Sequence, residues 1–277
     1  MFENRLESLS SLALKAAVWA ADQVNSSQDV TRTTREKESP RDVVTDTDIQ
    51  LETGIRKILA DSEIPVIGEE LSNSISVSDC LKGSAWIIDP IDGTANFSNG
   101  LPFYCHSIGL IMEQNLSAGA VANPMLGEVF FTIGNKGSYL NGKRLAATGC
   151  RLDESLIGVS FSGKKLTSDI RRREIELFGQ LNDQSRGCLR TGSAALNICY
   201  AAAGRLQVSY GIGSKIWDVA GALAIAKMAG CKMFVEFTSS SETVNYAVGS
   251  PGSTENIAEL LNSCNLAKLY ENNLALY

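Results

Sequence analysis

The sequence contains a single histidine and fewer basic than acidic residues. Its 277 residues include 25 Lys and Arg against 31 Asp and Glu, so the net charge is −6 at pH 7. A nucleic-acid partner needs clustered basic side chains, and this balance argues against one. The lone histidine, His106, excludes histidine-rich zinc sites and two-histidine phosphotransfer schemes, and we expect a structural role for it. Acid–base chemistry is therefore left to carboxylates, hydroxyls or metal-bound water.

Paired cysteines and long apolar runs are also missing. The seven cysteines are scattered and form no C-x-x-C pair, which predicts reduced thiols rather than a zinc site or disulfides. No apolar run reaches the roughly 18 residues of a membrane span. Glu3, Glu7 and Lys15 interrupt the apolar residues near the N-terminus, unlike in a signal peptide. We expect a cytoplasmic protein without a membrane partner.

Hydrophobic periodicity predicts a mixed α/β (α+β) protein. Apolar residues at helical spacing predict a helix over 3–24 and a second over 45–60, separated by a polar loop or loose hairpin at 25–41. The N-terminal half, 1–145, then becomes strand-rich, and we expect an antiparallel sheet there. Its predicted strands are 64–67, 85–88, 104–112, 119–122, 128–133 and 138–140.

Strands and helices alternate in the C-terminal half, 146–277. The predicted strands are 156–161, 186–190, 206–210, 231–236 and 245–249, and the predicted helices are 167–181, 193–203, 217–229 and 254–264. There is no internal repeat or low-complexity tract between the halves. We therefore expect one domain over 1–277.

The most informative segment is the run from Trp86 to Phe97. An apolar strand ends there in two carboxylates, Asp89 and Asp92, and the chain turns at once into Gly93 and Thr94. Carboxylates are hard oxygen ligands for Mg²⁺, which usually binds one or two of them together with phosphate oxygens. Backbone N–H groups at a turn or helix start can bind an anion. Both parts of a metal-dependent phosphate site are thus present within six residues.

Three further acidic motifs are ambiguous when taken singly. Asp218 begins an apolar helix and is equally well explained as a helix cap. Glu69 and Glu70 follow a short strand and are typical of a solvated turn. Asp46 and Asp48 fit an ordinary helix start. Asp89 differs from them because it directly ends an apolar strand, and a buried carboxylate needs a partner charge or a metal.

In combination these motifs resemble the inositol monophosphatase family of magnesium-dependent, lithium-sensitive sugar phosphatases. The signature D-P-[IL]-D-G-T-x-x-F is matched from Asp89 to Phe97, and W-D-x-A-[GA] from Trp217 to Gly221. G-E-E at 68–70 and a T-x-T-D-like segment ending at Asp48 complete the set in the expected order. The resemblance covers nearly the whole chain. It implies a layered α-β-α-β-α sandwich, a small-molecule phosphate monoester as substrate, and a homodimer.

The resemblance also implies a set of metal ligands. Glu69, Asp89 and the Ile91 carbonyl should hold one Mg²⁺, and Asp89, Asp92 and Asp218 a second, with Asp89 bridging the two. Glu69 should also help to bind a third, weaker ion, so that two to three ions occupy the site. Two ions about 4 Å apart clamp the entering and leaving oxygens of an in-line displacement. Without cations, these gathered carboxylates would repel one another strongly.

The remaining implied roles concern water and phosphate. Asp48 and Thr94 should orient the attacking water, with the Thr94 hydroxyl bonded to the Asp48 carboxylate. The N–H groups of Gly93 and Thr94 should bind the phosphate, and metal-activated water as nucleophile implies no phosphoenzyme. The loop at 25–41 either closes over the metals and brings Lys37 towards them or is a plain surface hairpin.

The substrate is less firmly indicated than the reaction. Family members that act on inositol phosphate commonly carry a glutamate where this chain has Gly211, and a missing hydrogen-bond partner alters selectivity. Gly192, Ser193 and Ala194, together with Asp92, should line the substrate pocket. Four cations lie in segments that either border it or are ordinary surface residues: Lys164, Lys165, Arg190 and Lys215.

Three hypotheses follow for the activity. The first is a Mg²⁺-dependent inositol-1-monophosphatase. The second is a related phosphatase for 3′-phosphoadenosine 5′-phosphate, fructose 1,6-bisphosphate or histidinol phosphate, because Gly211 replaces the usual glutamate. The third is a non-catalytic regulatory or binding protein on the same fold.

Overall fold

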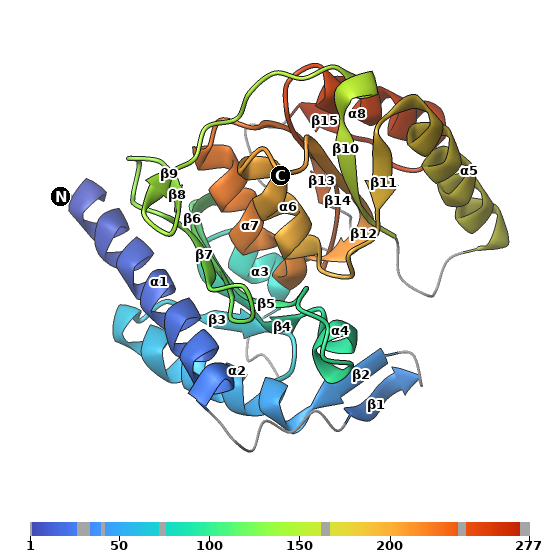
Figure 1. Ribbon diagram of the computed structural model, residues 1–277. Coiled ribbons are helices and arrows are strands. Elements are labelled where there is room, and N and C mark those ends of the chain that lie inside the picture. The colour runs from blue at the N-terminus through green and yellow to red at the C-terminus, as the bar shows by residue number, and fades with distance from the viewer. Residues whose placement is uncertain are drawn as a thin grey trace.

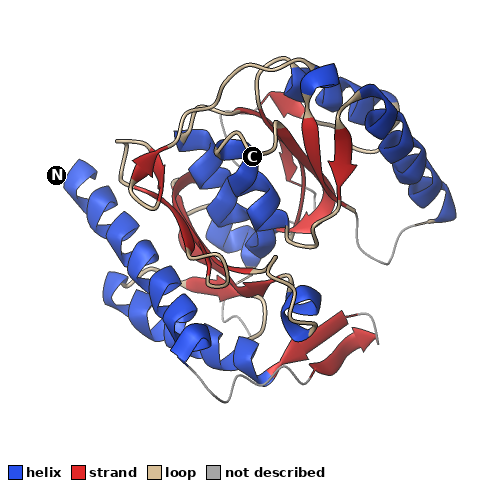
Figure 2. Cartoon of the chain, in the orientation of Figure 1, coloured by secondary structure: helices blue, strands red, loops and turns tan. Residues whose placement is uncertain are grey.

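Two β-sheets organise the chain, with helices outside and between them (Figures 1 and 2). The computed structural model describes residues 2–26, 34–39, 42–71, 76–161, 167–237 and 242–271. Among these residues no helix is both long enough and apolar enough to cross a membrane. Lys164 and Lys165 lie outside the described residues, and so does the side chain of Lys37.

The first layer consists of helices α1 (Phe2–Ser26) and α2 (Asp46–Leu59), which cover one face of the larger sheet (Figure 1). Leu6, Ala13 and Ala20 on α1 pack with Ile55 on α2 in one buried cluster. Both predicted helices are confirmed. Before α2, strands β1 (Thr34–Ser39) and β2 (Asp42–Thr45) form an antiparallel hairpin. Closure of this segment over the metals stays a prediction. A short 3₁₀ turn, η1 (Ala60–Ser62), follows α2.

The larger sheet has seven strands in the order β3-β4-β5-β6-β7-β8-β9. Their bounds are β3 (Val66–Gly68), β4 (Ser84–Asp92), β5 (Cys105–Met112), β6 (Asn115–Asn123), β7 (Glu128–Thr132), β8 (Ser138–Leu140) and β9 (Lys143–Arg144). The expected antiparallel pairing is wrong at one edge, because β3 runs parallel to β4. The connection between them passes through the short helix α3 (Val77–Leu81), and such a crossover lets the second strand return in the same direction.

The middle layer consists of helices α6 (Ala194–Ala202) and α7 (Ile216–Met228), which lie between the two sheets (Figure 2). The apolar character of α7 on nearly every side predicts burial, and this is confirmed. Glycines allow its close approach to the larger sheet: a Cβ on Gly119 would lie 2.1 Å from the Gly221 carbonyl oxygen, and one on Gly109 2.7 Å from the Gly221 nitrogen. This contact fixes the start of α7, which carries Asp218, above the end of β4.

The second sheet has six strands in the order β11-β10-β12-β14-β13-β15. Their bounds are β10 (Leu156–Ser160), β11 (Gly187–Leu189), β12 (Val208–Lys215), β13 (Lys232–Phe237), β14 (Thr243–Gly249) and β15 (Tyr270–Glu271). Pairing is parallel across β11, β10 and β12 and antiparallel beyond. The strand predicted at 206–210 continues to residue 215, because Ser214 and Lys215 pair with β14 after a bulge.

Helices α5 (Ser168–Gln184) and α8 (Ser253–Ser263) cover the outer face of the second sheet (Figure 1). They complete the expected α-β-α-β-α layering. A second 3₁₀ turn, η2 (Leu152–Glu154), precedes β10, and α4 (Thr94–Ser98), a helix not predicted from the sequence, follows β4. One buried cluster includes residues of both halves, such as Ile87 and Tyr246. The single-domain organisation stays a prediction.

Candidate active site

Asp89 and Asp92 lie at the C-terminal end of strand β4, where the strand is bulged. The pairing register with β5 shifts between these two residues, and the Asp89 Oδ1 atom accepts a hydrogen bond from the Ile91 N–H at 2.9 Å. Pro90 has no N–H to give to the ladder, which suits an interrupted strand end. Its carbonyl oxygen lies 2.5 Å from Nδ1 of His106. Both carboxylates are buried, at 2% and 6% exposure.

His106 supports this bulge through its hydrogen bond to Pro90. Burial lowers the pKa of His106 to about 4, so the imidazole is neutral and its Nδ1–H donates to the Pro90 carbonyl oxygen. Its Nε2 atom has no hydrogen-bond partner among the described residues. The structural role expected from the sequence agrees with this geometry.

Three carboxylates from different elements meet beside the bulge. Glu69 follows β3, Asp89 ends β4, and Asp218 stands in the first turn of α7, and one oxygen of each lies within 4.8 Å of the others. Burial raises the pKa of Asp89 well above its usual value, and repulsion from Glu69 and Asp92 raises it further. Burial and the Asp92 charge likewise raise the pKa of Asp218. A cluster of oxygen ligands in which Asp89 is buried and Glu69 and Asp218 are partly exposed is suited to a bound cation.

Asp92 lies against the start of α6. Its Oδ2 atom accepts hydrogen bonds from the Ser193 hydroxyl at 2.5 Å and the Ala195 N–H at 2.8 Å, while Oδ1 accepts one from the Ala194 N–H at 3.4 Å. Burial raises the pKa of Asp92 to about 6, although these hydrogen bonds oppose the shift. Ser193 is therefore a buried support for Asp92 as well as the N-cap of α6.

Asp48 and Thr94 lie next to each other in the structure, although they are 46 residues apart in the sequence. Asp48 is fully buried in the first turn of α2, and its Oδ2 atom accepts from the Thr45 backbone at 2.8 Å in a capping box. The Thr94 hydroxyl lies 3.5 Å from the other oxygen, Oδ1, and 3.1 Å from the Ile91 carbonyl oxygen. One hydroxyl proton can satisfy only one of these acceptors at a time.

Two glycines with positive φ, from different segments of the chain, lie close together beside Thr94. Gly93, with φ +97°, precedes α4, and its missing Cβ would lie 3.3 Å from the carbonyl oxygen of Gly192, which has φ +93°. The Asn96 amide joins the two segments, because its Nδ2 donates to the carbonyl oxygens of Phe103 at 2.6 Å and Thr191 at 2.8 Å. The first N–H groups of a helix have no acceptor within it, so this turn keeps donors available for a ligand.

Glu52 is a site residue that motif reasoning missed. It is a fully buried carboxylate on α2 that accepts from the Arg56 Nε at 2.9 Å and from the N–H groups of Glu70 at 2.8 Å and Leu71 at 3.2 Å. It thereby holds the turn that contains Glu69. The sequence did contain one signal for Glu52: it lies on the same face of the helix as Leu59, so an acid stands among the apolar residues that face the core.

A cavity of about 260 Å³ opens beside the carboxylates. Asp92 and Asp218 are among its lining residues, together with Gly192 and Ala194. Gly211 does not line it but lies next to it, where a Cβ would come within 2.6 Å of the Tyr246 ring. Of the predicted pocket residues, Ser193 points to Asp92 instead.

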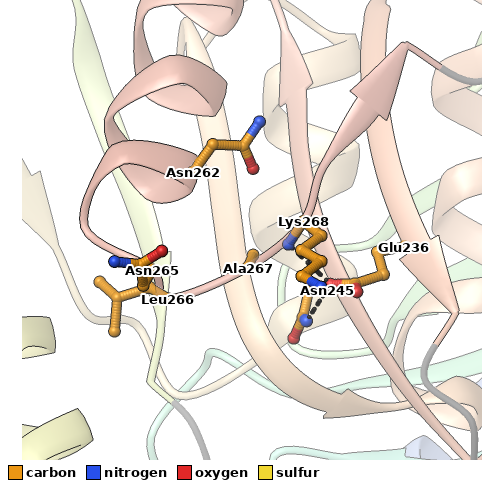
Figure 3. Close-up of a pocket in the computed structure, with 7 residues that line it drawn as sticks. All are labelled: Glu236, Asn245, Asn262, Asn265, Leu266, Ala267 and Lys268. Carbon is orange, nitrogen blue, oxygen red and sulfur yellow. Dashed lines mark hydrogen bonds between the residues drawn. The ribbon is translucent and has the colours of Figure 1, made fainter.

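A larger cavity of about 620 Å³ lies elsewhere, between the end of α8 and strands β13 and β14 (Figure 3). It contains none of the predicted site residues. Glu236 on its wall accepts hydrogen bonds from Asn245 Nδ2 at 2.7 Å and from the Lys268 N–H at 3.0 Å. The Glu236 carboxylate is thus occupied by its neighbours, and the carboxylate cluster stays the better candidate for chemistry.

Comparison with known proteins decides the family. The model of the inositol monophosphatase family matches residues 3–265. The chain belongs to the inositol monophosphatase family. This is a phosphatase family, and its members have the layered fold described above.

Individual relatives agree with this assignment. The chain is 40% identical over 172 residues to inositol monophosphatase 1 of Solanum lycopersicum; the match covers 61% of this chain and 62%, less than two thirds, of that protein. It is 33% identical over 178 residues to Nus factor SuhB of Pseudomonas aeruginosa, covering 64% and 65% of the two chains. The solved structure of Mycobacterium tuberculosis SuhB superposes with a TM-score of 0.75 at 29% identity, over 96% of this chain and 99% of that one.

Proposed function

We propose that the protein is a metal-dependent hydrolase of phosphate monoesters, with inositol 1-phosphate as the first substrate to test. The observation that carries this proposal is the meeting of the Glu69, Asp89 and Asp218 carboxylates next to a cavity of substrate size. Relatives named as inositol monophosphatases support the choice of substrate. A cytoplasmic location and a homodimer stay predictions.

The proposed ligands are all oxygen donors, which suits Mg²⁺. Glu69, Asp89 and the Ile91 carbonyl would hold one ion, and Asp89, Asp92 and Asp218 a second, with Glu69 contributing to a third. Bound there, the ions would supply a water nucleophile at neutral pH and stabilise charge on the phosphoryl oxygens. The raised pKa of Asp89 supports this assignment, because buried acids in mutual repulsion gain most from a cation.

The other residues would position the reactants. The Asp48 carboxylate, fixed by its capping box, would hold the Thr94 hydroxyl so that both orient the attacking water. The N–H groups of Gly93 and Thr94 would bind phosphate oxygens at the turn. Ser193 would keep Asp92 aimed into the site through its short hydrogen bond.

A substrate panel tests the proposal. We expect Mg²⁺-dependent phosphate release from at least one of inositol 1-phosphate, 3′-phosphoadenosine 5′-phosphate, fructose 1,6-bisphosphate and histidinol phosphate. Asp89→Asn should abolish release while circular dichroism shows the fold intact, whereas Asp183→Asn on the exposed face of α5 should not. Millimolar Li⁺ should inhibit the reaction. Full activity in Asp89→Asn would refute the assignment of the site.

A non-catalytic regulatory protein on the same fold is the second candidate. It is favoured by the relative named Nus factor SuhB, whose name describes a factor rather than a hydrolase. It predicts that the wild type, supplied with Mg²⁺, releases no phosphate from any of the four compounds. The complete set of carboxylates in this chain favours the hydrolase.

A further inference from the structure

The cavity beside the carboxylates is lined by side chains of both charges. Asp92 and Asp218 are the only acidic side chains among its described lining residues. The rest of the wall carries two cations, Arg190 and Lys215, and the hydroxyl of Ser214. A neutral polyol is normally held by acceptors as well as donors, whereas this wall offers mainly donors.

Arg190 is available to bind an anion. Its side chain is exposed, and it forms no hydrogen bond or ion pair with any other residue that the structure describes. Its backbone is nevertheless held in place, because the next residue, Thr191, accepts from Asn96 through its carbonyl and donates to Asn197 through its hydroxyl at 2.8 Å. A guanidinium on an anchored turn presents a planar fork that matches a phosphate group.

Lys215 provides the second cation among the residues that line the cavity. Its Nζ atom lies 3.1 Å from the Glu242 carboxylate and 5.1 Å from the centre of the Trp217 ring. Both charged side chains of that pair are about half exposed, and such pairs contribute little, so a ligand anion can compete for the ammonium group. The Lys215 backbone N–H donates to Asp218 Oδ2 at 3.2 Å, so the main chain of Lys215 lies beside this carboxylate.

Tyr246 fills the space beside Gly211. The buried ring occupies the space where a side chain at 211 would begin, 2.6 Å from the missing Cβ. Its hydroxyl donates to Ser160 at 3.2 Å, so the Ser160 hydroxyl keeps its own proton to donate into the cavity. Among the described lining residues, no acidic side chain other than Asp92 and Asp218 is present to accept from a sugar hydroxyl.

We propose that the preferred substrate carries a second phosphate, bound by Arg190 and Lys215 while the scissile phosphate lies at the carboxylates. This inference rests on the proposed function, since it concerns the alcohol part of the same substrate. We therefore expect a higher kcat/KM for bisphosphates than for inositol 1-phosphate, which is assayed first because of the names of the relatives.

Matched substrate pairs test the inference: adenosine 3′-phosphate against 3′-phosphoadenosine 5′-phosphate, and fructose 1-phosphate against fructose 1,6-bisphosphate. We expect kcat/KM to be at least roughly tenfold higher for the bisphosphate of each pair, the preference weakening as salt rises. In Arg190→Gln/Lys215→Gln the preference should fall about tenfold, because the variant loses charge-assisted bonds to the second phosphate. Lys143→Gln, an exposed lysine on β9, is the matched control and should keep it.

Two results would overturn the inference and leave the phosphatase proposal standing. One is an equal or lower kcat/KM for the bisphosphates, and the other is a variant that slows both members of a pair equally. If no compound is hydrolysed, the proposed function fails, and calorimetry then tests the inference by itself. It predicts tighter binding of 3′-phosphoadenosine 5′-phosphate than of adenosine 3′-phosphate, lost in the double variant; equal binding contradicts it.

Discussion

Glu52→Gln is the substitution that tests most sharply how α2 supports the metal cluster. Glutamine keeps the volume of the side chain, but it removes the charge opposite Arg56 and replaces one acceptor oxygen by an NH₂ donor. The native carboxylate accepts from the Arg56 Nε and Nη2 at 2.9 and 2.8 Å and from the N–H groups of Glu70 and Leu71. The substituted amide therefore faces donors that it cannot satisfy.

The size of the effect follows from the burial of this pair. Removing one partner of a buried ion pair costs about 3–5 kcal/mol. The Arg56 side chain is 24% exposed and regains some hydration, so we expect the lower end, about 3 kcal/mol. Because Glu52 holds the turn that carries Glu69, the half-saturating Mg²⁺ concentration should rise at least about tenfold, as for other residues that orient metal ligands.

Urea unfolding and Mg²⁺ titration of phosphate release measure the two effects. The midpoint of unfolding should fall with an unchanged m-value. Glu259→Gln on the exposed side of α8 is the control and should stay within about 0.5 kcal/mol of the wild type. A Glu52→Gln protein with wild-type stability and wild-type Mg²⁺ dependence would show that Glu52 does not hold the turn that contains Glu69.

Three further predictions concern the scaffold. In an NMR titration, the pKa of His106 should be near 4 instead of 6.5. Because the unfolded chain binds this proton at a higher pH than the folded chain does, the free energy of unfolding should fall as the pH drops from 6.5 to 4. A measured pKa near 6.5 would contradict this. Gly119→Ala should destabilise by about 3 kcal/mol or more in thermal unfolding, because its Cβ meets a carbonyl of α7, whereas Gly179→Ala has open space and should be neutral or stabilising. Asn96→Ala should lower the free energy of unfolding in urea by about 2 kcal/mol and raise KM, because it removes the bonds to Phe103 and Thr191. Asn99→Ala, whose contacts are local, should do neither. Equal effects of the two substitutions would contradict a role for Asn96 in joining these segments.

Local sequence signals predicted much of the fold and the positions of the acids. The apolar run before Asp89 identifies β4, and the apolar character of α7 predicts its burial, so both lie where expected. The direction of β3 was missed because pairing depends on the crossover through α3, which no local pattern specifies. Helix α4 was missed because five residues are too few for a periodic signal.

The supporting contacts could not be read from spacing. Asn96 bridges two loops about 95 residues apart in the sequence, and neither loop indicates the other. Tyr246 fills the space at Gly211 from a different strand, so the absent side chain was visible in the sequence but its replacement was not. Such contacts arise from tertiary packing, which local sequence patterns do not specify.

The most direct test of the central claim is phosphate release by chelator-stripped protein at rising Mg²⁺, for the wild type and Asp218→Asn. We expect no release without metal, recovery of activity in the wild type as Mg²⁺ is added, and little recovery in the variant. Release that persists in the stripped protein, or recovers equally in the variant, would contradict a metal-dependent site built on Glu69, Asp89 and Asp218.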